Sequence, residues 1–164
     1  YDGEPVTQLE HALQSAALAE SAGAPASLVT ASLLHDLGHM LNDQGDTPTL
    51  RGVDDVHQYA ALPFLRGLFG EDVLVPIQLH VDAKRYLCAA RPAYYASLSD
   101  DSKRSLVLQG GVYDGAAADS FIRQPLAADA VRLRIWDDRA KLAGAATPPL
   151  AHFLAIARGV ALTP

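Results

Sequence analysis

The stretch Leu33-Leu-His-Asp-Leu-Gly-His39 decides the fold and the site together. It places the ionisable pair His35 and Asp36 directly after an apolar run, on a helix that we expect from about Pro25 to about Met40. Such a pair is costly to bury unless it binds something, and a metal ion supplies that compensation. Adjacent helical residues point about 100° apart, so both side chains can reach one ion at the helix edge. His39 lies one turn beyond His35 and reaches the same pocket without ligating.

Asp36 has two carboxylate oxygens and can therefore bridge to a second ion. Further ligand-type residues stand on four other predicted helices: His11, His57, His80 and the pair Asp137-Asp138. One His-Asp dipeptide is common by chance, and a single histidine on an apolar helix is more often a core or surface residue. Five helices that each offer such a side chain form the accepted signature of a metal site. Imidazole and carboxylate together suit iron, manganese, zinc or similar ions.

Capping and turn residues divide the chain into helices, and no alternating strand pattern recurs. Thr7 to Glu10 reads as a capping box that opens a helix to about Ser21, which Gly23 ends. Further helices are expected from residue 54 or 55 to just before 70, from 72 to 80 or 87, after Leu98 with a Ser99 cap, at 119–124, at 127–141 and at 151–160. Pro76 is expected in or near the first turn of the helix from 72. The sequence predicts an all-α class, a compact helical bundle forming one domain over residues 1–164.

Composition narrows the classes of protein. Hydrophobic residues make up 49% of the chain and charged residues 20%, which is ordinary for a globular domain. The net charge of −6 offers no basic field, so no nucleic-acid partner is expected. One cysteine, Cys88, excludes a disulfide framework and a Cys-rich zinc site. The apolar runs are too short to cross a membrane and no signal peptide opens the chain, so the expected compartment is the cytoplasm. The oligomeric state stays open.

The order of these residues resembles that of the HD-domain superfamily over nearly the whole chain. The resemblance implies a helical bundle with a two-metal centre. One metal would have four ligands, His11, His35, Asp36 and Asp137. Asp36 would bridge to a second metal held by His57 and His80.

Five segments are similar to the PhnZ-type oxygenases: residues 1–11, 34–39, 80–84, 108–111 and 133–141. Those enzymes use a mixed-valent Fe²⁺/Fe³⁺ pair and O2 to cleave the C–P bond of an α-hydroxyphosphonate. The resemblance implies two iron ions here, although other divalent metals can replace them in a recombinant sample. It also implies the release of phosphate and a carboxylic acid. That acid would be glycine from 2-amino-1-hydroxyethylphosphonate, or a betaine from the trimethylammonio analogue.

The resemblance carries over to a substrate pocket. Tyr1 would cap an iron before the substrate arrives, and Glu4 would meet the amino end of the substrate. The phosphonate pocket would be lined by His39, Lys84 and Ser102, with Arg134 as a weaker candidate.

Several of these residues also have an ordinary structural interpretation. Lys84 lies one turn after His80, where a cation would suit a dianionic phosphonate, but a solvated helix lysine is the commoner case. Tyr1 could be a frayed terminus. Asp138 is not cleanly separable from Asp137 as a ligand. Gln109-Gly-Gly111 is better read as a plain turn than as a phosphate-binding loop. Trp136 is expected in the core and His152 on the surface.

Three rival functions remain at this point. Most HD domains are phosphohydrolases that act on phosphoesters or nucleotides with metal-activated water. Glu4, His39 and the additional histidines His57 and His80 favour the oxygenase. An inositol-oxygenase-like enzyme is disfavoured by the segment from Tyr1 to Glu4. A degenerate HD domain that only binds a ligand would lack metal ligands, and none is missing here.

Overall fold

Helices of very different length make up the fold, and the computed structural model describes residues 5–41 and 48–163. The elements are α1 (Gln8–Ser21), α2 (Ala26–Leu34), α3 (Leu37–Leu41), the 3₁₀ helix η1 (Pro48–Arg51), α4 (His57–Ala60), α5 (Leu62–Leu65), α6 (Glu71–Ala90), α7 (Tyr94–Ser97), α8 (Asp100–Leu108), α9 (Gly115–Ile122), α10 (Ala127–Arg139) and α11 (Leu150–Val160). These residues contain no β-strand, only an isolated bridge between Phe69 and Ala161, so the all-α prediction is confirmed. Among them, no helix is long and apolar enough to cross a membrane.

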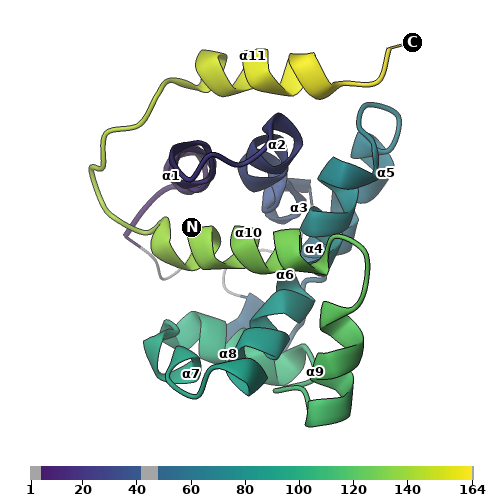
Figure 1. The fold of residues 1–164 in the computed structure, drawn as a ribbon. Coiled ribbons are helices and arrows are strands. Elements are labelled where there is room, and N and C mark those ends of the chain that lie inside the picture. The colour runs from purple at the N-terminus through teal and green to yellow at the C-terminus, as the bar shows by residue number, and fades with distance from the viewer. Residues whose placement is uncertain (1–4, 42–47, 164) are drawn as a thin grey trace.

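The most extensively packed pair of described helices, α6 and α10, lies at the centre of the molecule (Figure 1). On one side, α1 and α2 pack together and α11 lies across them. On the opposite side, α7, α8 and α9 form a second group around the far end of α6. Because α2 contacts α1, α6, α10 and α11, the elements that carry the predicted metal ligands meet around it.

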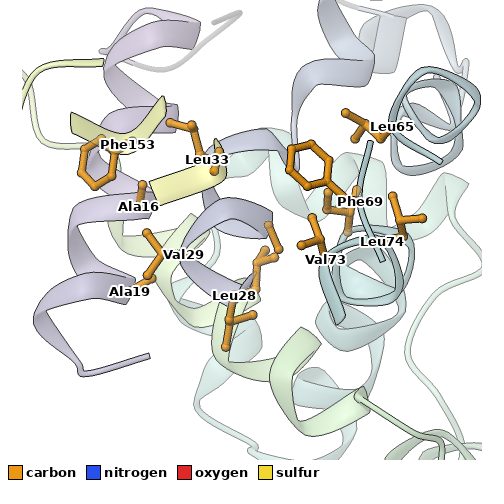
Figure 2. Packing of buried hydrophobic residues seen from close by; sticks show 14 of the residues in the cluster. Ala16, Ala19, Leu28, Val29, Leu33, Leu65, Phe69, Val73, Leu74 and Phe153 are labelled. Carbon is orange, nitrogen blue, oxygen red and sulfur yellow. The ribbon is translucent and has the colours of Figure 1, made fainter. Parts of the chain in front are cut away.

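The main hydrophobic core joins α1, α2, α5, α6, α10 and α11 (Figure 2). Ala16 of α1 is fully buried, and its small side chain lets α1 approach α2 closely. Phe153 is 1% exposed and fastens α11 to this layer. Burying a side chain of this size contributes about 1.5–3 kcal/mol, which explains how a helix at the chain's end is held in place.

The local helix signals are confirmed where they act through neighbouring residues. Thr7 and Glu10 form the predicted capping box, with reciprocal bonds of 3.2 Å and 2.7 Å. Gly23 follows α1 with a φ of +68°, which favours glycine. Ser99 caps α8 by accepting from the backbone N–H of Ser102 at 3.2 Å. The last helix, α11, begins within one residue of its predicted start.

The prediction of one helix from about Pro25 to about Met40 is wrong at the residues that matter most. The helix ends at Leu34, His35 and Asp36 form a turn, and α3 resumes at Leu37. The His35 ring donates from Nδ1 to the Ser32 carbonyl at 2.9 Å, which orients the ring. The break between α2 and α3 thus lies at the site itself.

The prediction of one helix from residue 54 or 55 to just before 70 is also wrong. The helical segment starts at His57 and divides at Ala61 into α4 and α5. Pro63, at the start of α5, has no N–H to donate to the preceding turn, which explains the division.

Three other boundaries differ from expectation. The helix expected from residue 72 is α6, which starts at Glu71 and runs to Ala90. Pro76, expected in or near the first turn, lies inside the helix just beyond that turn. The predicted turn at 119–124 belongs to α9, which starts at Gly115 because Asp114 caps the N–H of Ala117 at 2.7 Å. The short α7 was not expected. The long α6 places His80 and Lys84 one turn apart on a buried face.

Gly38 lets α3 and α4 touch. A Cβ at this position would lie 1.9 Å from the backbone oxygen of His57, a distance that no side chain tolerates. Position 38 therefore requires a glycine, because the backbone of His57, 19 positions later, occupies the space of a side chain.

We expect Gly38→Ala to lower the free energy of unfolding by about 2 kcal/mol or more, because the two short helices must separate. Gly159→Ala in α11 is the matched control, since nothing lies within 4 Å of a Cβ there. It should be neutral or stabilising by up to about 1 kcal/mol. Urea denaturation followed by circular dichroism measures both, and equal stabilities would contradict this account of Gly38.

Candidate metal centre

Six predicted ligands converge in the interior, where α1, the turn after α2, α4, α6 and α10 meet. None of them is more than 7% exposed. They are His11, His35, Asp36, His57, His80 and Asp137. Charged and polar side chains at this depth require partners, and the six contact one another across a shared interior volume.

The first group consists of His11, His35 and Asp137. The Nε2 atoms of the two histidines are 3.3 Å apart. Oδ1 of Asp137 lies 3.3 Å from Nε2 of His11 and 3.9 Å from Nε2 of His35. All three ligand atoms therefore surround one small volume.

The second group consists of Asp36, His57 and His80. The Nε2 atoms of the two histidines are 3.0 Å apart, and Oδ1 of Asp36 lies 3.6 Å and 3.8 Å from them. In the first group, Oδ2 of Asp36 lies 3.4 Å from Nε2 of His11, and Oδ1 lies 3.5 Å from Nε2 of His35. Asp36 thus stands between the two groups, with its carboxylate within reach of both.

Each of the four histidines is anchored through its other ring nitrogen, Nδ1. Three donate to backbone carbonyls: His11 to Ala140 at 2.9 Å, His35 to Ser32 at 2.9 Å and His80 to Ile77 at 2.6 Å. The fourth, His57, donates to Oδ1 of Asp55 at 2.8 Å. A neutral imidazole that carries its proton on Nδ1 presents a lone pair on Nε2.

Two such Nε2 lone pairs that face each other at 3.0 Å or 3.3 Å repel unless a proton or a metal cation lies between them. Metal–ligand bonds of about 2.0–2.2 Å place two ligands of the same ion about 3–3.5 Å apart, which matches these separations. The chemistry and spacing of the donor set therefore fit two metal ions, one in each group, with the carboxylate of Asp36 shared.

The electrostatics of the centre favour positive charge. Burial opposes the ionised form of Asp36, but the surrounding histidines, with His35 foremost, hold its pKa well below the usual range. For Asp137, burial is likewise outweighed, mainly by the Arg134 guanidinium, and the pKa again lies well below its usual range. Burial alone would lower the pKa of His35, yet Asp36 and Asp137 raise it to about 9. A field that attracts a proton this strongly also attracts a metal cation.

His39, Asp55 and His57 form a third group. Its contacts are shorter: Asp55 lies 2.5 Å from Nδ1 of His39 and 2.8 Å from Nδ1 of His57. These are hydrogen-bond distances, below the separation that two ligands keep on one ion. The rings of His39 and His57 stack with centroids 4.0 Å apart, and Nε2 of His39 lies 3.7 Å from Oδ1 of Asp36. His39 is therefore at the edge of the second group.

Lys84 is only 2% exposed, so the alternative that it is a solvated helix lysine is wrong. Its ammonium donates to the hydroxyl of Ser105 at 2.7 Å, and that hydroxyl donates to the carbonyl of Ser102 at 3.1 Å. Burial, reinforced by the charge of Arg134, lowers the pKa of Lys84 to about 7. An anion that binds beside this buried ammonium would form a strong charge-assisted hydrogen bond and stabilise the protonated form of Lys84.

Arg134 separates the roles of the two neighbouring aspartates. Its guanidinium pairs with Oδ2 of Asp137 at 2.8 Å and with both carboxylate oxygens of Asp138. The hydroxyl of Tyr94 also donates to Asp138. Asp137 therefore faces the histidines, while Asp138 faces Arg134 and Tyr94. That Arg134 contacts the substrate stays a prediction.

The remaining predicted site residues lie as follows. Tyr1 and Glu4 are outside the described residues. Ser102 is 7% exposed, with its carbonyl bonded to Ser105 beside Lys84. The turn reading of 109–111 is supported, because the carbonyls of Gly110 and Gly111 accept from Arg85.

Trp136 is buried in the main core, as predicted. His152 is at the surface, also as predicted, and pairs with Glu20 at 2.8 Å.

Two residues of this region, Asp55 and Ser105, were not predicted from the sequence. Their spacing from predicted site residues could have indicated both. Asp55 stands two positions before a predicted ligand, His57, and Ser105 lies one turn after Ser102 on the same helix.

An all-helical domain with two abutting His/Asp groups that share one aspartate defines a class, the two-metal centres of the HD type. Comparison with known proteins narrows it. No family model matches the chain. Over 154 residues it is 45% identical to a hydroxymethylphosphonate dioxygenase of Gimesia maris, covering 93% of this chain and 76% of that protein.

Two further relatives extend this result. A [1-hydroxy-2-(trimethylamino)ethyl]phosphonate dioxygenase (glycine-betaine-forming) of Leisingera caerulea is 38% identical over 93% of this chain and 78% of its own length. An uncharacterized protein of Acanthamoeba polyphaga mimivirus is 34% identical over 93% of this chain and 71% of its own length. The chain therefore belongs to the family of PhnZ-type hydroxyphosphonate dioxygenases.

We expect Asp36→Ala to abolish stable binding of both metal ions, because it removes the ligand that the two groups share. Asp137→Ala should weaken the first ion and leave the second bound. Elemental analysis of purified, iron-supplemented protein measures the ratio of metal to chain, with His152→Ala as a surface control expected to match the wild type. Two ions per chain in Asp36→Ala would contradict the shared-ligand arrangement.

Proposed function

We propose that this chain is an oxygenase that uses two iron ions and O2 to cleave the C–P bond of an α-hydroxyphosphonate. The main support for this proposal is that four Nε2 atoms and two carboxylates converge in the interior of the protein, and that the chain belongs to a dioxygenase family. A phosphohydrolase is the second candidate, since metal-activated water needs similar ligands. The names of two relatives favour the oxygenase.

His11, His35, Asp36 and Asp137 would hold one iron, and Asp36, His57 and His80 the other. When bound, a mixed-valent iron pair supplies the redox chemistry that O2 requires. The Nδ1 hydrogen bonds turn the Nε2 atom of each ligand ring toward the centre, and burial of all six side chains shields the centre from bulk water.

The phosphonate would bind beside the second group. The Lys84 ammonium offers a buried positive charge, and the hydroxyl of Ser105 with the α8 segment around Ser102 offers polar contacts close by. His39 lies at the other edge of the same group. Together they would neutralise the dianion and orient the carbon that carries the hydroxyl group.

Hydroxymethylphosphonate is the first candidate substrate, because the relative that uses it is 45% identical to this chain. With this substrate, one O2 yields one formate and one phosphate. A trimethylammonium group would call for a cage of aromatic faces. Two of the tyrosines already have partners: the Tyr94 hydroxyl donates to Asp138, and the Lys103 ammonium lies over the Tyr95 ring. The amino and trimethylammonio substrates, giving glycine and betaine, are the alternatives to be tested alongside.

Iron-loaded protein should release phosphate from at least one of these three hydroxyphosphonates in air, consuming about one O2 per phosphate, as the balanced reaction requires. Without O2, release should stop after the oxygen carried over is used. Phosphate release that continues anaerobically, or hydrolysis of p-nitrophenyl phosphate at a comparable rate, would identify a phosphohydrolase instead.

We expect Lys84→Met to raise KM for the phosphonate about 10- to 100-fold, because a charge-assisted hydrogen bond contributes roughly 1.5–3 kcal/mol. In the wild type, Lys84 is protonated below its pKa of about 7 and neutral above it. KM of the wild type should therefore rise as pH increases through 7. The variant retains the ionisation of the substrate but not that of Lys84, so the ratio of the two KM values should shrink at high pH. A pH-independent ratio would contradict this role.

A further inference from the structure

Asp55 is a buried carboxylate at the entrance to α4 that the ligand set leaves out. We propose that Asp55 is a positioning residue for the second metal site and for the substrate pocket at once. One of its oxygens aligns the ligand His57, and the other aligns His39. The inference rests on the proposed function, because it assigns His57 to a metal and His39 to the substrate.

The carboxylate of Asp55 contacts both rings. Oδ1 accepts from Nδ1 of His57 at 2.8 Å and from its backbone N–H at 3.4 Å. Oδ2 lies 2.5 Å from Nδ1 of His39. The two rings stack nearly parallel, with 19° between their planes. One carboxylate therefore clamps a stacked pair.

The contacts of Asp55 determine which nitrogen of each ring faces the metal centre. Because both Nδ1 atoms donate to Asp55, the Nε2 atoms of His39 and His57 face inward. Nε2 of His57 then faces His80 at 3.0 Å, and Nε2 of His39 faces Oδ1 of Asp36 at 3.7 Å. A carboxylate partner also makes a ligating imidazole more basic than a carbonyl partner does. His57 has the carboxylate, whereas the other three ligand histidines donate to carbonyls.

The backbone around Asp55 is shaped to make this contact. Val56, between Asp55 and His57, has φ +46° and ψ +32°, a left-handed conformation that is costly for a β-branched residue. Strain of this kind persists where the surrounding structure demands it. On the facing side, Gly38 has no Cβ and so admits the His57 backbone against α3. Both features bring the His57 ring into line with His39.

The test compares Asp55→Ala with Asp119→Ala, an exposed carboxylate on α9 away from the centre. Apo-protein is titrated with Fe²⁺ under anaerobic conditions, and binding of each ion is followed by calorimetry. Asp55→Ala should bind the first ion as the wild type does and the second about 10- to 100-fold more weakly. Asp119→Ala should bind both normally. Two ions bound by Asp55→Ala with wild-type affinity would overturn the proposal.

Asp55→Asn tests the other half and remains informative if the alanine variant does not fold. The His57 backbone N–H favours the amide oxygen on its side, so the amide NH2 would face Nδ1 of His39. This variant should retain two ions yet show a raised KM for the phosphonate. Its effect should not add to that of His39→Gln. Additive effects, or an unchanged KM, would overturn the role assigned at His39.

The failure of this inference is distinguishable from the failure of the proposed function. If the wild type binds no second ion, or turns over no hydroxyphosphonate, the proposed function fails first. If the wild type does both and the Asp55 variants match it, only the positioning role fails.

Discussion

Four imidazole Nε2 atoms that face one another are the constraint on which the rest of the structure depends. Each ring is held by a hydrogen bond at Nδ1, so its Nε2 stays turned toward its neighbours. At separations of 3.0 Å and 3.3 Å each pair of Nε2 atoms needs a proton or a metal cation between them. Asp36 and Asp137 add negative charge to the same volume, which attracts such cations. The bundle thus maintains a polar interior that two metal ions would neutralise.

The fold departs from regular helix wherever this constraint requires it. A turn at His35 and Asp36 separates α2 from α3, Val56 adopts a left-handed conformation before His57, and Gly38 leaves room for the His57 backbone. Away from the centre, α1, α2 and α11 pack through an ordinary apolar core, which supplies the stability that these departures cost.

Much of this could be predicted from sequence. The all-α class, the capping box at Thr7 and the cap at Ser99 follow from short-range rules, and spacing was enough to nominate the histidines that converge. What could not be predicted depends on contacts between distant segments. Helical periodicity gives no reason to expect the turn at His35 and Asp36, since the apolar pattern continues through it. Periodicity does not settle the burial of Lys84, which depends on contacts with α8. Asp55 follows Asp54 directly before a helix, where either aspartate is ordinarily interpreted as a cap.

The most direct test of the two-metal centre is anomalous X-ray diffraction at the iron edge from crystals of iron-loaded protein. The account predicts two peaks about 3.5–4 Å apart, one on each side of the Asp36 carboxylate. One peak would lie among His11, His35 and Asp137, and the other beside His57 and His80. A single peak, or a peak among His39, Asp55 and His57, would contradict the shared-aspartate arrangement.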